Sequence, residues 1–258
     1  NPLVLSSGRY EMNFDELATC AADPRTTMLF LCNPHNPVGR VWTKAELTQL
    51  GAICRQNGVV VVSDEIHADI TFQNFPYTPF ASISDADAQN SITCLSPAKS
   101  FNIAACCGAF TVVSDENRRN ALKAENSRLT VNKNNAFASV AMEVAYKDGG
   151  PWLDAAIAYI EGNLSLVRAR LSDIPEASLI EPEGTFLIWL DFRQLGLSPS
   201  ELTEFLRCEA GWAITRGIAF GDSGAGFGRL IIACPRARLE RALDRLVQAI
   251  SKTRDTAQ

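Results

Sequence analysis

Histidine is scarce in this sequence, and the cysteines are not spaced for a metal site. The chain has two histidines, and none of its eight cysteines stands in a C-x-x-C pair. The sequence therefore gives no metal site, since zinc is usually held by clustered histidine and cysteine. We expect the thiols to be free in a reducing compartment, which predicts a cytoplasmic protein.

Long apolar runs and an excess of positive charge are lacking as well. No run is long enough to cross a bilayer, so we expect no membrane partner. The net charge of −5 and the isoelectric point near 5.2 do not favour a nucleic-acid surface. The 258 residues, 47% of them hydrophobic, are enough for one large or two ordinary globular domains.

Three short apolar runs are each followed by polar residues suited to chemistry. Residues 28–32 lead into N-P-H-N-P-V-G at 33–39, residues 59–63 into D-E-I-H at 64–67, and residues 92–95 into S-P-A-K-S-F-N at 96–102. A helix with a capping box at Thr43 and Glu46 separates the first two runs, which predicts parallel strands in an α/β sheet. Ligands bind beyond the carboxyl ends of such strands, so the three motifs should meet at one crevice.

The order and spacing of these motifs resemble the fold-type I pyridoxal phosphate (PLP) enzymes of aminotransferase class I/II. The D-E-I-H form and the S-F-N after the lysine are most similar to the cystathionine β-lyase branch, the C–S lyases. The resemblance implies a PLP-binding large domain at 1–150, with a mostly parallel sheet and flanking helices. A smaller α+β domain at 151–258, entered by a long helix, and a homodimer are also implied.

Lys99 and Asp64 are the central candidates. A partly desolvated lysine beyond a buried strand can become a nucleophile, although a solvated loop lysine would also fit the local pattern. The resemblance assigns Lys99 the Schiff base with PLP, and its free amine the removal of the substrate α-proton. Asp64 would face the pyridine nitrogen and keep it protonated; its alternative is to cap the next turn.

Other cofactor contacts follow from the same resemblance. Ser96 would contact the phosphate, and Asn36 would donate to the phenolic oxygen and border the substrate. An Asx-turn at Asn36 is compatible with that role. His67 would either touch the cofactor or pack beside its ring, and His35, between prolines, is expected to be structural.

Arg229 is the candidate for the substrate, and we expect it just before a strand at 230–234. The resemblance implies that it binds the α-carboxylate, which a guanidinium can grip with two hydrogen bonds. Without the resemblance, a surface arginine at a strand edge would be the simpler interpretation. The chain departs from the family at Ala98, where many relatives have serine or threonine, and at Cys107, where many aminotransferases have a phosphate-binding arginine.

The preferred reaction is α,β-elimination from cystathionine or another cysteine S-conjugate, giving a thiol, pyruvate and ammonia. An aminotransferase on the same scaffold is the first alternative, and a non-catalytic regulatory protein or inactive fragment is the second. The resemblance further implies an N-terminally truncated chain, lacking an upstream phosphate-binding helix and a ring-stacking aromatic residue. Such a chain is expected to retain PLP weakly and to show little activity alone.

Helical periodicity gives two further expectations about packing. A helix at 132–147 should turn Ala136, Val140, Val144 and Phe137 inward. A last helix after Pro235 should bury Leu239, Ala242, Leu246 and Ile250 rather than Leu243.

Overall fold

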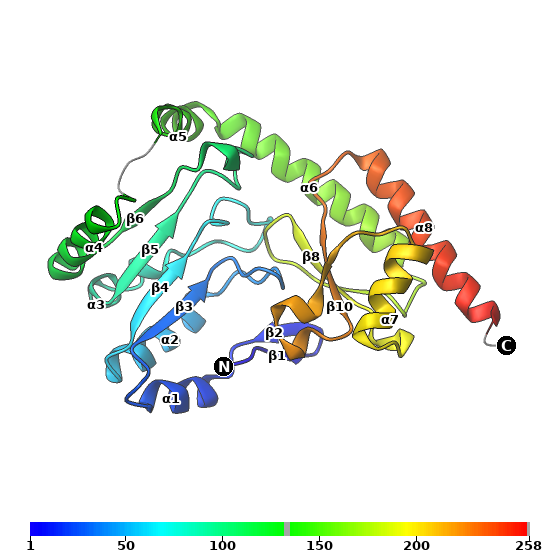
Figure 1. The fold of residues 1–258 in the computed structure, drawn as a ribbon, viewed down its shortest axis with the longest axis horizontal. Coiled ribbons are helices and arrows are strands. Elements are labelled where there is room, and N and C mark those ends of the chain that lie inside the picture. Colours follow the sequence, from blue (N-terminus) through cyan, green and yellow to red (C-terminus); the bar gives the residue numbers. More distant parts are fainter. Residues whose placement is uncertain (132–134, 257–258) are drawn as a thin grey trace. The chain divides into compact units, whose positions relative to one another are not determined.

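The computed structural model describes residues 1–131 and 135–256, and Figure 1 shows how their elements are arranged. The helices are α1 (Phe14–Ala22), α2 (Lys44–Gln56), α3 (Asp85–Gln89), α4 (Glu116–Arg128), α5 (Ala136–Asp148), α6 (Gly150–Leu171), α7 (Pro199–Glu204) and α8 (Arg236–Thr256). The strands are β1 (Val4–Ser6), β2 (Arg9–Glu11), β3 (Met28–Cys32), β4 (Val60–Asp64), β5 (Ser91–Leu95), β6 (Phe110–Val112), β7 (Ser178–Ile180), β8 (Leu187–Asp191), β9 (Thr215–Arg216) and β10 (Phe227–Ile231). Among the described residues, no helix is both long and apolar enough to span a membrane.

The chain forms two compact units. The first contains Asn1–Ser6, Tyr10–Asn36 and Arg40–Ala155, and the second contains Ser7–Arg9, Pro37–Gly39 and Ala156–Gln258. The expected domain boundary at 150/151 falls at the start of α6, whereas the two units divide within that helix, between Ala155 and Ala156. The assignment of the first unit to the cofactor stays a prediction.

A mixed sheet with the strand order β3-β4-β5-β6 organises the first unit. Strands β3, β4 and β5 are parallel, and β6 runs antiparallel to β5. In this register Asp64 lies opposite both Cys32 and Cys94, so β3, β4 and β5 end at the same edge. The predicted mostly parallel α/β sheet is confirmed, and its carboxyl edge carries the three sequence motifs.

Helices α1 and α2 build the core of the first unit with β3 and β4. The helices begin where side-chain oxygens cap backbone N–H groups, at Asn13 for α1 and at Thr43, in a full capping box, for α2. Their apolar faces bury a cluster with the sheet, made of Leu17, Ala21, Leu31, Trp42, Leu47, Leu50, Cys54, Val59, Val61 and Phe80. Burial of this cluster fixes β3 and β4, and with them the turns that follow.

The expected packing of the helix before residue 148 was wrong. Phe137, Val140 and Val144 are 80%, 64% and 52% exposed, while the neighbouring Ala138 is fully buried. A Cβ on Gly108 would clash with the Met142 side chain and lie 3.6 Å from Ala138 Cβ, so α5 turns the 138/142 seam toward that glycine. The contact of α5 with Gly108 is therefore made by the small Ala138 and the flexible Met142 rather than by the aromatic and β-branched side chains. Residues 132–134 of the expected helix lie outside the described residues.

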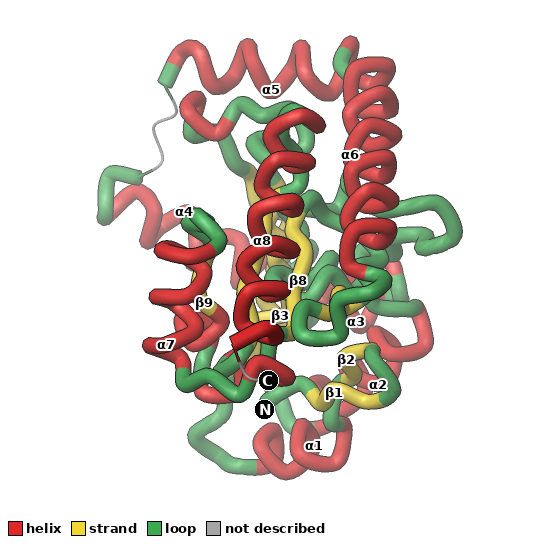
Figure 2. The backbone as a smooth tube through the Cα atoms, turned by 90° about the vertical axis from the view of Figure 1, so that its right-hand side faces the viewer, coloured by secondary structure: helices red, strands yellow, loops and turns green. Residues whose placement is uncertain are grey.

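The second unit contains an antiparallel sheet with the order β7-β8-β10-β9. The long helices α6 and α8, shown in red in Figure 2, are joined by an ion pair between Arg170 and Asp244. Burial on α8 corrects the sequence expectation: Leu243 is fully buried, whereas Ala242 is half-buried. The last strand also begins earlier than expected, at Phe227.

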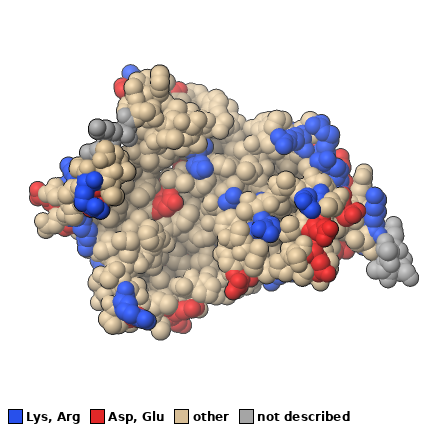
Figure 3. Space-filling view, in the orientation of Figure 1, with Lys and Arg blue, Asp and Glu red and all other residues tan. Residues whose placement is uncertain are grey.

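Acidic and basic side chains are interspersed on the face shown in Figure 3, and much of that face carries neither. This distribution agrees with a net charge of only −5 over the chain.

Candidate functional site

The turn after β3 is fixed by a buried amide. Asn33 is buried, and its side chain accepts a hydrogen bond from the N–H of Trp42 at 3.2 Å and donates to the carbonyl of Thr78 at 3.1 Å. The indole of Trp42 donates to the carbonyl of Cys32 at 2.9 Å, which closes the turn. Asn36, half-buried within this turn, places its backbone N–H 3.5 Å from Cys32 Sγ. Its predicted contacts with cofactor and substrate stay predictions.

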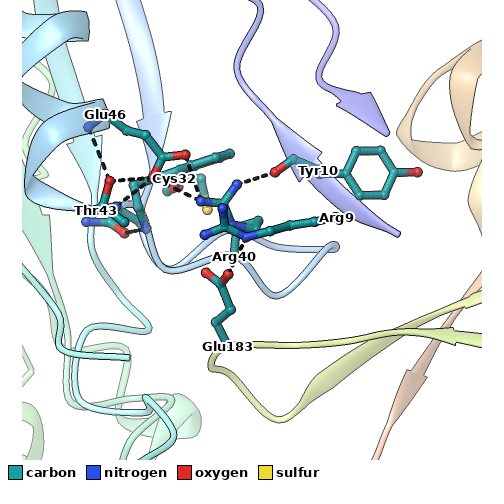
Figure 4. Close-up of polar contacts among 9 residues, drawn as sticks. Arg9, Tyr10, Cys32, Arg40, Thr43, Glu46 and Glu183 are labelled. Atoms are coloured by element: carbon teal, nitrogen blue, oxygen red, sulfur yellow. Dashed lines mark hydrogen bonds and ion pairs between the residues drawn. The ribbon is translucent and has the colours of Figure 1, made fainter. Parts of the chain in front are cut away.

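Arg40 closes the same motif with an ion pair, as Figure 4 shows. Its guanidinium donates to both carboxylate oxygens of Glu46 at 2.7 and 2.9 Å, also donates to the carbonyl of Tyr10, and lies 4.4 Å from the Trp42 ring centre. Burial alone would raise the pKa of Glu46, but hydrogen bonds from Arg40 and Thr43 outweigh it and lower that pKa. The pair therefore stabilises the turn that carries Asn36.

The two histidines differ in burial, since His67 is buried and His35 is half-buried. Burial, together with the charge of Arg40, lowers the pKa of His35 to about 4, so this ring is neutral at neutral pH. Its edge contacts Trp42 with ring centres 5.8 Å apart, which fits the expected structural role. His67 is buried in the turn after β4, where its carbonyl accepts the N–H of Ile70 at 2.9 Å.

Asp64 is the last residue of β4 and is half-buried. Its side-chain Oδ1 accepts the backbone N–H of Ile66 at 3.2 Å, and its carbonyl accepts the N–H of Asn33 at 2.9 Å. The second bond links the turns after β3 and β4. The capping alternative considered for Asp64 is thus present as a local turn contact.

The turn after β5 presents Lys99 to solvent, so the expected partial desolvation is not seen and the alternative of a solvated loop lysine describes its surroundings. Lys99 is exposed, whereas Ser96 and Ser100 on either side are buried. The Ser96 hydroxyl donates to the carbonyl of Gly108 at 2.6 Å and accepts the N–H of Ala98 at 3.1 Å. Because its hydrogen points to that carbonyl, Ser96 organises the lysine turn in this state, and its phosphate contact stays a prediction.

Two further contacts tie the lysine turn to neighbouring elements. The Ser100 hydroxyl donates to Asp69 Oδ2 at 2.6 Å, which joins this turn to the segment after β4. The ring of Phe101 meets Tyr146 edge-on at 5.8 Å between centres and lies 6.2 Å from the Trp152 ring. The serine and phenylalanine of the S-F-N signature therefore position the lysine backbone.

Arg229 lies in the second unit, inside β10 rather than before a strand as expected. Its guanidinium donates to Thr215 Oγ1 at 3.1 Å and lies 5.0 Å from the ring centre of Phe220. Partial burial lowers the pKa of Arg229, as desolvation does for a cation. Its predicted role toward a substrate carboxylate stays a prediction.

The structure brings the candidate residues of the first unit to one edge of one sheet. Asn36 follows β3, Asp64 ends β4, and Ser96 and Lys99 follow β5, the neighbour of β4. An exposed primary amine and a half-buried carboxylate thus stand on adjacent turns. Such a pair can attach a carbonyl compound covalently and hold a proton on a nearby base. Within the described ranges, no group of three or more histidine, cysteine or acidic side chains could hold a metal ion.

Sequence reasoning missed two acidic residues of this edge. Asp69 is contacted by Ser100 across thirty-one positions of sequence, and no local pattern announces that pairing. Glu65 follows Asp64 directly after β4, and no local pattern indicates that its carboxylate would accept hydrogen bonds from Tyr77 and Phe80.

Known proteins resemble this chain in both sequence and fold. The chain is 42% identical over 252 residues to cystathionine beta-lyase PatB of Bacillus subtilis, covering 97% of this chain and 65% of that protein. It is 35% identical to protein MalY of Escherichia coli, covering 93% of this chain and 61% of that one. The structure of cystalysin from Treponema denticola, which contains a pyridoxal 5'-phosphate cofactor, superposes with a TM-score of 0.93 at 32% identity, covering 97% of this chain and 64% of that one.

The chain thus spans less than two thirds of the length of these relatives. The family model for aminotransferase class I and II matches residues 4–246, which include every motif at the strand ends. The resemblance seen in the motifs is thereby confirmed over nearly the whole chain, and the chain belongs to the aminotransferase class I and II family.

Proposed function

We propose that the protein binds pyridoxal phosphate at the carboxyl edge of the β3–β6 sheet and acts as a C–S β-lyase on cysteine S-conjugates such as cystathionine. The observation that carries this proposal is the pairing of Asp64 and Lys99 on the turns of two adjacent parallel strands. The relatives support the choice of reaction, because PatB, 42% identical to this chain, is a cystathionine beta-lyase by name.

The residues at this edge fit the cofactor in their chemistry. An aldehyde needs a primary amine that can reach it, and Lys99 is exposed on a turn whose backbone is held at both ends. A pyridine nitrogen needs a carboxylate, and Asp64 is half-buried with its Oδ1 accepting the Ile66 N–H. Asn36 would contribute an amide donor from the neighbouring turn.

When bound, pyridoxal phosphate supplies an electron sink for the α-carbon of an amino acid. Asp64 would hold a proton on the pyridine nitrogen, since an ionised carboxylate stabilises a neighbouring cation. The Nζ of Lys99 would bind the aldehyde carbon and, once released by the substrate amine, accept the α-proton as a general base. Arg229 would bind the substrate carboxylate through two charge-assisted hydrogen bonds.

Transamination is the second candidate, because aminotransferases are among the more distant relatives. An aspartate aminotransferase of Pyrococcus abyssi is 24% identical over 249 residues. Asp64, Lys99 and Arg229 serve both reactions, so they do not distinguish them. A cytoplasmic site of action is part of the same proposal, supported by the free state of all eight cysteines.

One assay separates the two reactions. Purified protein is loaded with pyridoxal phosphate and given cystathionine, with and without a 2-oxo acid acceptor. A lyase releases pyruvate and a thiol in both cases, whereas an aminotransferase turns over only with the acceptor. Turnover that depends strictly on the acceptor would overturn the lyase proposal and leave the cofactor proposal standing.

A further inference from the structure

Glu65 is a buried acid directly beside Asp64, with 1% of its surface exposed. Its side chain lies among three donors that come from both sides along the chain. Oε1 accepts the Ser63 hydroxyl at 2.7 Å and the backbone N–H of Phe80 at 3.0 Å, while Oε2 accepts the Tyr77 hydroxyl. This carboxylate therefore ties the end of β4 to a segment that returns to it after more than ten residues.

The backbone of Glu65 is fixed as firmly as its side chain. Its N–H donates to the carbonyl of Cys94 at 2.9 Å, which extends the ladder between β4 and β5. Its carbonyl accepts the N–H of Ala68 at 2.9 Å and so shapes the turn that holds His67. The turn at 65–68 is thus bound to β5 by its backbone and to residues 77–80 by the Glu65 carboxylate.

This anchorage reaches Asp64 through one backbone donor. The Ile66 N–H, which lies inside the anchored turn, donates to Asp64 Oδ1 at 3.2 Å. Asp64 is the last residue of β4 and is half-buried, whereas Glu65, the next residue, is buried. The orientation of the Asp64 carboxylate consequently depends on where the turn holds Ile66.

The electrostatics at Glu65 agree with a held carboxylate. Burial raises the pKa of Glu65, while the hydrogen bonds from Tyr77, Ser63 and Phe80 lower it in part. Burial and the adjacent Glu65 charge also raise the pKa of Tyr77, so this hydroxyl keeps its proton and stays a donor. Hydrogen bonds from three donors offset the free-energy cost of burying the Glu65 carboxylate.

We propose that Glu65 is a positioning residue for the reaction: with Tyr77 and Phe80 it locks the turn that donates Ile66 N–H to Asp64, and so aims the Asp64 carboxylate. This inference rests on the proposed role of Asp64 toward the cofactor. Glu65 itself touches neither cofactor nor substrate in this account. A purely structural acid in the core would stabilise the fold without changing what Asp64 does.

The first arm of the test needs no cofactor. Amide hydrogen exchange is measured on the whole chain, unloaded, for the unsubstituted protein, Glu65→Gln and Tyr77→Phe. Glu65→Gln should speed exchange at Ile66 and Phe80 by about tenfold, the size expected when a hydrogen bond to a charged group is weakened. Tyr77→Phe, which keeps the carboxylate, should give a smaller increase at the same amides. Unchanged exchange at Ile66 in both variants would overturn the inference.

The matched control is Asp87→Asn. Asp87 is also a buried acid of the first unit, held by Arg55 and Ser84 at the start of α3. Its substitution should disturb exchange around α3 and leave Ile66 unchanged. Equal acceleration at Ile66 in this control would show a general loss of stability, which also counts against the inference.

The second arm uses the chain loaded with pyridoxal phosphate and reads the position of its visible absorbance band. Asp64→Asn should shift the band, Glu65→Gln and Tyr77→Phe should shift it partway in the same direction, and Asp87→Asn should leave it in place. No shift in Asp64→Asn would contradict the proposed function, while the exchange arm still decides the role of Glu65. A shift confined to Asp64→Asn would overturn the inference alone.

Discussion

The turns after β4 and β5 are neighbours at one sheet edge, yet they are held in different ways. The turn after β4 is anchored by the buried Glu65 carboxylate and keeps Asp64 half-buried. The turn after β5 is anchored by the hydroxyls of Ser96 and Ser100, while Lys99 between them is exposed. The difference fits the two proposed roles, because a carboxylate that holds a proton on the cofactor should stay in place, whereas an amine that is displaced by substrate should be able to move.

The largest effect on turnover is expected at Asp64, beside the turn after β4. Asp64→Asn should leave pyridoxal phosphate able to bind but slow turnover of cystathionine by about 10²–10⁴-fold, since a neutral amide cannot hold a proton on the pyridine nitrogen. Steady-state pyruvate release with bound cofactor measured in parallel checks this. The exposed Asp85→Asn, on α3, is the control and should be silent; near-normal turnover in Asp64→Asn would remove the assignment.

The second effect tests a group that belongs to neither turn. Arg229→Ala should weaken the binding of amino-acid substrates by about 2–5 kcal/mol, the range for losing one partner of a buried charge pair. Amines that lack the carboxylate should be affected little, because they do not use the guanidinium. Arg216→Ala, an exposed arginine on the adjacent strand β9, is the matched control. Equal losses for acids and amines would exclude the carboxylate role.

A third prediction compares the two anchors of the lysine turn. Ser96→Ala leaves the Gly108 carbonyl and the Ala98 N–H without their hydroxyl partner, which should cost about 1–3 kcal/mol of the free energy of unfolding. Ser100→Ala frees the Asp69 carboxylate, which is exposed and can bind water, so its cost should be about 0.5–1.5 kcal/mol. Urea denaturation of both variants measures the difference; a larger loss at Ser100 would contradict this ordering.

The smallest effect is a pH dependence of the free energy of unfolding that comes from Glu65, in the turn after β4. The pKa of Glu65 is raised above its ordinary value of 4.5 in the folded chain, mainly by burial. At pH values between 4.5, the ordinary pKa, and the raised pKa of the folded chain, Glu65 is protonated in the folded chain but ionised in the unfolded chain. The contribution of Glu65 to the free energy of unfolding therefore falls as pH rises through that range. Glu65→Gln should remove this component. The measurement is the difference in unfolding free energy between the two proteins against pH; a flat difference contradicts a raised pKa.

The sheet edge was predictable because its signals are local. Apolar runs ending in N-P-H-N-P-V-G, D-E-I-H and S-P-A-K-S-F-N gave three strand ends, and the capping box at Thr43 gave the helix that makes two of them parallel. The sequence alone therefore predicts that Asn36, Asp64 and Lys99 lie at one edge of the sheet. The resemblance to a family added the chemistry, which spacing alone does not supply.

The rest depended on contacts that have no local signature. On α5 the seam is chosen by Gly108 across the chain, so the exposed Phe137 and Val140 could not be told from core residues. On α8 the apolar stripe was broad enough to bury Leu243 as well as Leu239. The Ser100–Asp69 bond is equally distant in sequence. The hydrophobic periodicity predicts which face of a helix is apolar. The element packed against the helix determines which residues of that face are buried.

The central claim is that Lys99 carries the cofactor. The protein loaded with pyridoxal phosphate is reduced with borohydride, digested, and its peptides are mapped by mass spectrometry. We expect the pyridoxyl group on the Lys99 peptide of the unsubstituted protein and of the control Lys123→Ala. In Lys99→Ala, treated in the same way, the corresponding peptide should carry no label. A pyridoxyl group found on another lysine, with Lys99 unlabelled, would contradict this claim.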